Sequence, residues 1–249
     1  NMLLAIDIGN TNITFGLFKK NGLVKVFDAA TKNCDSHLFI RRKIGGCHNF
    51  SGAVICSVVP KKTKQIYGIL HKEFGIKAKI IGKDIKVPIK NLYGSPKQVG
   101  QDRLVVAYAC KKLYGSPAII IDFGTAITFD YINKSGAYEG GVIAPGIGIS
   151  LDALYENTAL LPMAKFPKKT GHLIGKNTKE SILSGATYGL FSMCDGLISA
   201  IKKHTKGKTK VIATGGAADM FYKNCKFIDK VDKGLILKGI LLVRHCEER

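Results

Sequence analysis

The feature that most constrains this chain is a short acidic hairpin that occurs twice. In the first copy, the apolar run Met2–Ile6 leads into Asp7-Ile8-Gly9-Asn10-Thr11-Asn12, and a second apolar run follows at Ile13–Phe18. In the second copy, Ala118–Ile121 leads into Asp122-Phe123-Gly124-Thr125, and an apolar strand follows again. Apolar runs of this length joined by Gly-rich turns are typical of buried strands in hairpins. The repeat predicts two similar α/β halves with a cleft between them.

The segments around the two hairpins complete an α/β pattern in each half. A third strand is expected after each hairpin, at Leu23–Phe27 and Tyr138–Ala144. A strand that stops at Pro60, a helix over Lys61–Phe74 and a short strand at Ala78–Ile81 form a βαβ unit. The remaining expected elements are a helix over Gly100–Leu113, a helix ending near Asn157, a helix from Thr178 to about His204, a strand over Val211–Gly216 and a helix over Leu235–His245. We place the halves at residues 2–116 and 117–249, with the last helix closing the second half.

The hairpin turns have the composition of a phosphate-binding site. Gly9 lets a ligand approach the main chain closely, and successive N–H groups in such a turn form a concavity that binds anions. Asp7, at the end of the first strand, can hold a hydrated Mg²⁺ against a phosphate, because hard cations prefer oxygen ligands. The alternative is an ordinary hairpin turn, since Gly and Asn are common turn formers. The second copy at Asp122 favours the phosphate site.

The large positive charge of the chain says little about its function. The formal charge is +20, but the lysines are spread along the whole sequence, with no Trp and no recognisable nucleic-acid module beside them. This pattern is typical of a solvated Lys-rich surface, so nucleic-acid binding is not expected, although the excess charge helps to attract anionic small molecules. No apolar run approaches the roughly eighteen residues of a membrane span, and the start lacks the basic region of a signal peptide.

The cysteines do not form a disulfide framework. There are seven, an odd number, and no CxxC pair occurs. Free thiols in a reducing cytoplasm fit this pattern better, so a cytoplasmic location is expected. One group, Cys34, His37, Cys47 and His48, could in principle bind zinc, but its spacing matches no standard site.

Several separate motifs, in this order and spacing, give the chain a family resemblance. They are Asp7-Ile8-Gly9-Asn10-Thr11-Asn12, Cys56-Ser57-Val58-Val59-Pro60, Gly100-Gln101-Asp102-Arg103, Ile121-Asp122-Phe123-Gly124-Thr125-Ala126 and Gly140-Gly141-Val142-Ile143-Ala144-Pro145-Gly146. The chain resembles the acetate and sugar kinase/Hsp70/actin superfamily and, within it, the type III pantothenate kinases. The resemblance implies the actin-like ATPase fold: two ribonuclease H-like halves, each with a mixed sheet flanked by helices, and an active site in the cleft between them.

The resemblance also implies an activity. It implies a homodimeric enzyme that uses ATP to phosphorylate pantothenate to 4'-phosphopantothenate, the first step of coenzyme A biosynthesis. Mg²⁺ and a monovalent cation, K⁺ or NH₄⁺, are the implied cofactors, with Asp122 holding the monovalent cation. Asp102 would be the general base. The residues implied to bind ATP are Asp7, Ile8, Gly9, Asn10, Thr11, Asn12, Ile13, Thr14 and Thr125. Those implied to bind pantothenate are Tyr93, Gly100, Gln101, Asp102, Arg103 and Thr178.

The chemistry of these residues agrees with the implied roles. Phosphoryl transfer needs positioning, charge neutralisation and a group that receives the hydroxyl proton. Asp102 lies in the first turn of an expected helix, where the helix dipole favours the ionised carboxylate, and Arg103 offers a planar fork for a carboxylate or phosphate. Taken alone, Asp102-Arg103 is better explained as a charged helix start with a surface arginine, and only the family motif favours the catalytic role. The alternative for Tyr93 is a loop anchor, and the alternative for Thr178 is a helix N-cap. Two other functions remain open: a non-catalytic accessory factor for transcription on the same fold, and a kinase for another small molecule.

Overall fold

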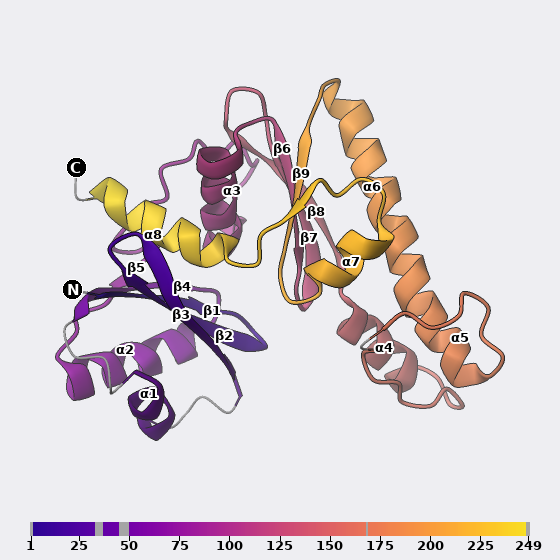
Figure 1. Cartoon of the computed structure of the whole chain (residues 1–249), viewed down its shortest axis with the longest axis horizontal. Helices are drawn as coiled ribbons and strands as arrows, with labels where there is room; N and C mark the ends of the chain where they lie inside the picture. Colours follow the sequence, from indigo (N-terminus) through magenta and orange to yellow (C-terminus); the bar gives the residue numbers. More distant parts are fainter. Residues whose placement is uncertain (1, 33–36, 45–49, 168, 248–249) are drawn as a thin grey trace. The chain divides into compact units, whose positions relative to one another are not determined.

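The computed structural model describes residues 2–32, 37–44, 50–167 and 169–247. The chain divides into two compact units, the first formed by residues 1–112 with 234–249 and the second by residues 113–233. Each unit contains one five-stranded mixed sheet flanked by helices, the fold class that the two hairpins predicted (Figure 1). The sequence placed the boundary at residue 116 and gave the last helix to the second half, whereas the structure groups that helix with the first unit.

The first sheet has the order β3-β2-β1-β4-β5. β1 and β2 form the first hairpin, β3 extends it as an antiparallel meander, and β4 and β5 run parallel to β1. The strands are β1 (Met2–Ile8), β2 (Asn12–Lys19), β3 (Gly22–Ala30), β4 (Phe50–Ser57) and β5 (Lys79–Ile80). The helices of this unit are α1 (His37–Ile44), α2 (Pro60–Phe74), α3 (Gln101–Tyr114, whose last two residues belong to the second unit) and α8 (Leu235–Glu247).

The alternation of β1 decides which way Asp7 points. Successive side chains of a strand lie on opposite faces of the sheet. Leu4, Ile6 and Ile8 lie on one face and pack in a core with residues of α1 and α2. Ala5 lies on the other face, in the core that includes residues of α3 and α8. Asp7 shares the face of Ala5, so the first acidic residue lies on the face of the sheet that packs against α3.

The placement of α8 has a packing cause. Leu237, Ile240 and Val243 of α8 are buried in the first unit, and each buried apolar side chain stabilises the fold by roughly 1.5–3 kcal/mol. A Cβ at Gly239 would lie 2.6 Å from Cγ1 of Val105, so this glycine lets α8 approach α3 closely. The last helix therefore belongs to the first sheet in space, although it follows the second sheet in sequence.

The second sheet repeats the first, strand for strand. Its order is β10-β9-β6-β7-β8. β6, β7 and β8 form an antiparallel meander, and β9 and β10 run parallel to β6. The strands are β6 (Ala118–Phe123), β7 (Ala126–Ile132), β8 (Tyr138–Pro145), β9 (Lys210–Thr214) and β10 (Lys230–Val231). Asp7 pairs with Thr14 in the first hairpin, and Asp122 pairs with Thr128 in the second. The internal repeat predicted from the sequence is confirmed.

The helices of the second unit pack on one face of its sheet (Figure 1). They are α4 (Ile147–Glu156), α5 (Thr178–Ser184), α6 (Leu190–Thr205) and α7 (Ala218–Asn224). The long helix expected from Thr178 is present as α5 and α6, joined by a π-helical turn at Gly185–Gly189. Ile119, Ile121 and Phe123 of β6 point into this helical core, so Asp122 lies on the opposite face, as Asp7 does in its own sheet. The sequence missed α7 and β10.

None of the helices in the described residues is long and apolar enough to cross a lipid bilayer.

Candidate active site

The turn of the first hairpin is held rigid by its own main chain and by one threonine. The N–H of Gly9 donates to the carbonyl of Asn12 at 2.9 Å. Thr31, directly after β3, donates from Oγ1 to the carbonyl of Gly9 at 2.8 Å and from its N–H to the carbonyl of Thr11 at 2.8 Å. The side chains of Asn10, Thr11 and Asn12 are exposed. The turn therefore presents polar groups outward from a fixed backbone. Thr31 was not predicted, because no local sequence pattern marks it.

The residues around this turn divide into exposed and buried sets. Ile8 and Ile13 are fully buried in the core, so only their main-chain atoms are available to a ligand. Thr14 donates from Oγ1 to Oδ1 of Asp28 at 2.6 Å, which links β2 to β3. Asp7 is half-buried on the opposite face from the two isoleucines. Of the eight residues expected to surround the ATP phosphates, Asp7 is the one that offers a carboxylate.

Cys56 lies beside Asp7 in the first sheet. It is the register partner of Asp7 across β1 and β4, and it is fully buried. Burial raises the pKa of its thiol well above the usual value, and the carboxylates of Asp7 and Asp102 raise it further. Both carboxylates are thus close enough to this buried thiol to affect its pKa, although Asp7 and Asp102 are far apart in sequence. Because its pKa is raised, the Cys56 thiol stays neutral.

The surroundings of Asp102 change the pKa of its carboxyl. It lies in the first turn of α3, and its Oδ1 accepts a hydrogen bond from the N–H of Arg103 at 2.8 Å. Burial raises the pKa of the Asp102 carboxyl from its ordinary value of 3.8, while the Arg103 N–H and guanidinium oppose part of that rise. A Cβ at Gly100 would come within 3.0 Å of this Oδ1, so only glycine leaves room for the carboxylate as it stands. A raised pKa makes Asp102 a stronger base than an exposed aspartate.

The other residues expected to bind pantothenate in the first unit lie at the start of α3 and in the loop before it. The side chain of Gln101 lies directly against Gly82, in the turn after β5. Nη2 of Arg103 is buried in the protein. Tyr93 is held by its main chain, since its N–H donates to Oδ1 of Asn91 at 3.0 Å, and Nδ2 of Asn91 donates to the carbonyl of Pro96 at 3.3 Å. Asn91 thus fixes the loop that carries Tyr93.

Two glycines, Gly124 and Gly215, shape the turn of the second hairpin. The N–H of Gly124 donates to the carbonyl of Ala126 at 3.2 Å, as Gly9 does to Asn12 in the first copy. Gly215, after β9, has φ +89°, and a Cβ there would lie 2.8 Å from Phe123 N and even closer to Oδ1 of Asp122. The backbone of this turn therefore lies directly against the half-buried Asp122 carboxylate.

Thr125 and Thr178 are the two threonines expected to contact ligands in the second unit, and both are exposed. The N–H of Gly146 donates to the carbonyl of Thr125 at 3.2 Å. Thr178 is the first residue of α5, and Asn177 is the N-cap, because its side chain accepts from the N–H of Glu180 at 2.9 Å. Oε2 of Glu180 accepts from the N–H of Lys176 at 2.8 Å, which completes a reciprocal cap. The hydroxyl of Thr178 is therefore not needed as the cap.

The residues expected to hold metal ions would provide few protein ligands to each ion. Among the described residues, no three His, Cys, Asp or Glu side chains gather where they could hold a metal ion. Mg²⁺ is usually bound through one or two carboxylates, water and substrate phosphates, so the carboxylate of Asp7 fits that ion. Asp122, with a main-chain turn directly beside its oxygen, fits a cation that takes oxygen ligands. Cys34, Cys47 and His48, together with the side chain of His37, lie outside what the structure describes, so the zinc hypothesis stays untested.

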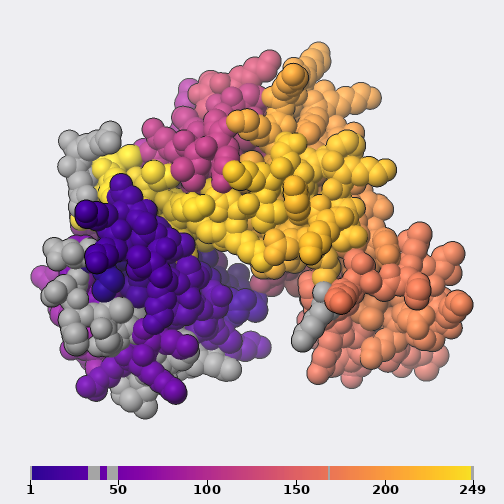
Figure 2. Space-filling view, viewed as in Figure 1, coloured from indigo at the N-terminus to yellow at the C-terminus, as the bar shows by residue number. Residues whose placement is uncertain are grey.

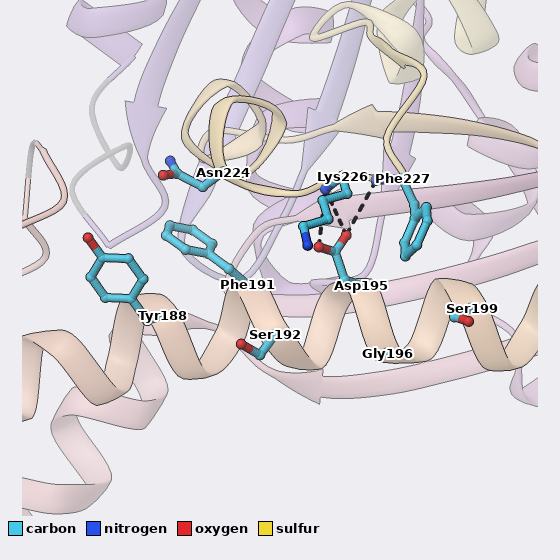
Figure 3. Close-up of a pocket in the computed structure, with 9 residues that line it drawn as sticks. All are labelled: Tyr188, Phe191, Ser192, Asp195, Gly196, Ser199, Asn224, Lys226 and Phe227. Carbon is cyan, nitrogen blue, oxygen red and sulfur yellow. Dashed lines mark hydrogen bonds between the residues drawn. The ribbon is translucent and has the colours of Figure 1, made fainter. Parts of the chain in front are cut away.

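One pocket in the second unit is lined by none of the candidate site residues. It has a volume of about 470 Å³ and lies between α6 and the segment after α7, lined by residues such as Phe191, Asp195 and Phe227 (Figure 3). The carboxylate of Asp195 accepts hydrogen bonds from the N–H groups of Lys226 at 3.0 Å and of Phe227 at 3.4 Å. Asp195 therefore has a structural role, since it fastens this segment to α6.

Comparison with known proteins decides the family. A family model described as type III pantothenate kinase matches residues 3–200. The chain belongs to the type III pantothenate kinase family. Two relatives named type III pantothenate kinase, from Moorella thermoacetica and Halalkalibacterium halodurans, are 39% and 40% identical, and each match covers 97% of this chain and 98% of the relative. The family predicted from the motifs is confirmed.

Solved structures confirm the fold of this type III pantothenate kinase family member. A ROK family glucokinase from Streptomyces griseus, in complex with glucose and AMPPNP, matches with a TM-score of 0.54 and 13% identity, covering 98% of this chain and 100% of the other. The activator of the 2-hydroxyisocaproyl-CoA dehydratase from Clostridium difficile, with bound ADPNP, also matches with a TM-score of 0.54, at 10% identity, covering 100% and 96%. Both have the actin-like ATPase and sugar kinase fold.

Proposed function

We propose that this chain transfers the γ-phosphoryl group of ATP to the hydroxyl group of pantothenate, with Asp102 as the general base. Family membership gives the reaction: the chain is a pantothenate kinase of coenzyme A biosynthesis. The assignment of Asp102 as the base is supported by its environment: the carboxyl is half-buried, its pKa is raised, and it accepts a hydrogen bond from the N–H of Arg103. In the proposed step, Asp102 receives the hydroxyl proton as the pantothenate oxygen attacks the γ-phosphorus, and ADP leaves.

The phosphate groups of ATP are assigned to the first hairpin. The main chain of Gly9–Asn12 is fixed by Thr31, which supports a preformed anion site in the turn. In this proposal the stretch from Asp7 to Thr14 wraps the phosphates, with Ile8 and Ile13 contributing main-chain atoms. Thr125 of the second hairpin contributes a further ATP contact.

Pantothenate is assigned to the start of α3 and the loop before it. Gln101 and Arg103 offer hydrogen-bond donors for its amide and carboxylate groups, and the Arg fork suits a carboxylate in particular. Gly100 leaves room for the carboxylate of Asp102. Tyr93 and Thr178 are proposed as the remaining contacts, and the exposed side chain of Thr178 is compatible with that role.

Two cations complete the proposed site. Asp7 would hold Mg²⁺ through water, and Asp122 would hold K⁺ or NH₄⁺. When bound, the cations neutralise charge on the phosphates during transfer. The carboxylate of Asp7 lies near the end of β1, and the turn at Gly215 packs directly against the carboxylate of Asp122.

We also propose that the protein is a homodimer, with α4 and the loop after it at the interface. This segment, the salmon-coloured lobe in Figure 2, exposes large apolar side chains, with Leu160 91% exposed and Ile174 81% exposed. Exposed apolar surface of this extent is typical of an interaction site.

Sedimentation is expected to give twice the mass of one chain. The variant Leu160→Asp should shift the protein toward monomer, whereas His172→Asp in the same loop should not, and a monomeric wild type would refute the proposal.

The cytoplasm is the proposed location. Among the described residues, Cys56, Cys110, Cys194, Cys225 and Cys246 are all free thiols. Thiols stay reduced in the cytoplasm, where ATP is also available. Cell fractionation should recover the activity in the supernatant, and recovery with the membranes would contradict this.

The reaction itself is tested with purified protein, ATP and pantothenate. ADP, measured directly by chromatography, is expected to form only with pantothenate present, to require Mg²⁺ and to form faster with K⁺ or NH₄⁺ than with tetramethylammonium. Direct detection avoids a coupling enzyme with its own cation requirement. Turnover with a sugar or another short acid but not with pantothenate would indicate another small-molecule kinase. No turnover, combined with salt-sensitive DNA binding, would favour the accessory-factor function.

A further inference from the structure

Gly82 lies in a tightly built turn beside the start of α3. Its N–H donates to the carbonyl of Ile85 at 2.7 Å, and Oδ2 of Asp84 accepts from the N–H of Ile80 at 2.8 Å. Ile81 and Ile85, on either side of the turn, are buried in the same core as Val105 of α3. The turn is therefore fixed relative to α3 by packing and by hydrogen bonds.

The surface of this turn restrains one side chain in particular. A Cβ at position 82 would lie 2.7 Å from both Cγ and Cδ of Gln101 and 3.0 Å from its Oε1. The space that a side chain at position 82 would fill is thus occupied by Gln101. Gly82 also has φ +88°, a conformation that favours glycine, but that requirement alone says nothing about Gln101.

We propose that Gly82 is a positioning residue for Gln101, and that it determines through Gln101 how tightly the enzyme holds pantothenate. The inference rests on the proposed function, in which Gln101 contacts that substrate. A glutamine side chain is long and loses rotamer freedom when it binds a ligand. The flat main chain of Gly82 limits the positions open to Gln101 beforehand, so less freedom is lost on binding. Gly82 itself does not contact the reacting atoms in this proposal.

The variant Gly82→Ala tests the proposal against a matched control. Gly75 also has a left-handed conformation, φ +66°, but a Cβ there would meet nothing within 4 Å, so Gly75→Ala adds the backbone strain without the contact. Gly82→Ala is expected to raise the KM for pantothenate about tenfold, the effect of losing one hydrogen-bonding group, while kcat changes by no more than about twofold. Gly75→Ala should leave both constants unchanged, and the Kd for ATP should be the same in all three proteins.

A double-mutant cycle with Gln101→Ala separates positioning from general damage. With the Gln101 side chain removed, Gly82→Ala should raise KM by no more than about twofold further. In urea unfolding, Gly82→Ala should lower the midpoint more than Gly75→Ala does, and this excess should disappear in the Gln101→Ala background. Equal KM values for Gly82→Ala and Gly75→Ala, or an undiminished effect of Gly82→Ala without Gln101, would overturn the inference alone. A wild-type protein without pantothenate turnover would overturn the proposed function, and with it the link to substrate, whereas the urea cycle would still report the contact.

Discussion

Replacing Asp102 with Asn is expected to lower kcat for pantothenate phosphorylation by about 10²–10⁴-fold, the usual contribution of a general base. The amide keeps the shape of the side chain and can still accept the hydrogen bond from the N–H of Arg103. It cannot accept the proton of the substrate hydroxyl, so the loss should fall on kcat. Steady-state kinetics with direct ADP detection measure the effect.

Two controls make the Asp102→Asn result decisive. The Kd for ATP should stay unchanged, because the phosphates are assigned to the first hairpin. Glu73→Gln, which neutralises an exposed carboxylate on α2 of the same unit, should keep full turnover. If Asp102→Asn retained the wild-type kcat, Asp102 would be eliminated as the base.

The raised pKa of Asp102 makes two further outcomes part of this prediction. Because the base must be ionised, kcat/KM should fall as pH drops through the pKa of the folded protein, which lies above 3.8. The folded state binds this proton more tightly than the unfolded chain does, so the group costs stability at pH values above its folded pKa. Asp102→Asn should therefore raise the unfolding midpoint at neutral pH, and the gain should shrink as pH falls through the same range. An Asn variant that is less stable at neutral pH would show that burial is not the dominant influence on Asp102.

The fold was largely predictable because its signal is local and repeated. The two hairpins at Asp7 and Asp122 each place an apolar run, a Gly turn and a second apolar run within a few residues of one another, and the observed sheets share one strand order. The elements that were missed, α7 and β10, have seven and two residues, too few to display a helical or strand period. The placement of α8 depends on packing against Val105, which the local sequence around Leu235 does not encode.

The candidate site was predictable only where a residue type carries the chemistry. Asp7 was proposed because a carboxylate at the end of a strand suggests binding, whereas Asp102 was proposed only through the motif Gly100-Gln101-Asp102-Arg103 of the family resemblance. Thr31, Cys56 and Gly82 were not predicted as site residues, although Cys56 begins one of the family motifs, since each acts through a contact with a residue distant in sequence. Thr31 fixes the Gly9 turn, Cys56 pairs with Asp7 across two strands, and Gly82 lies against Gln101. Such contacts arise only when the strands are aligned in register.

The variant Gly100→Ala is expected to lower kcat by about a hundredfold, the usual cost of displacing a catalytic group by roughly an ångström. The φ of Gly100 lies outside the left-handed region, so alanine can adopt this backbone without strain. The added Cβ would come within 3.0 Å of Oδ1 of Asp102, so the carboxylate must turn away and give up its 2.8 Å hydrogen bond from the N–H of Arg103. Kinetics should show the loss in kcat, with the Kd for ATP unchanged.

Gly94→Ala is the matched control for Gly100→Ala. Gly94 lies in the preceding loop, its φ is also outside the left-handed region, and a Cβ there would meet nothing within 4 Å. Its kcat should stay at the wild-type value, and both variants should unfold at similar urea concentrations. The contrast with Gly82→Ala is informative, because one glycine is expected to act on kcat through the base and the other on KM through Gln101. If Gly100→Ala kept a kcat within about twofold of Gly94→Ala, the close packing of Gly100 against Asp102 would not set the geometry of the base.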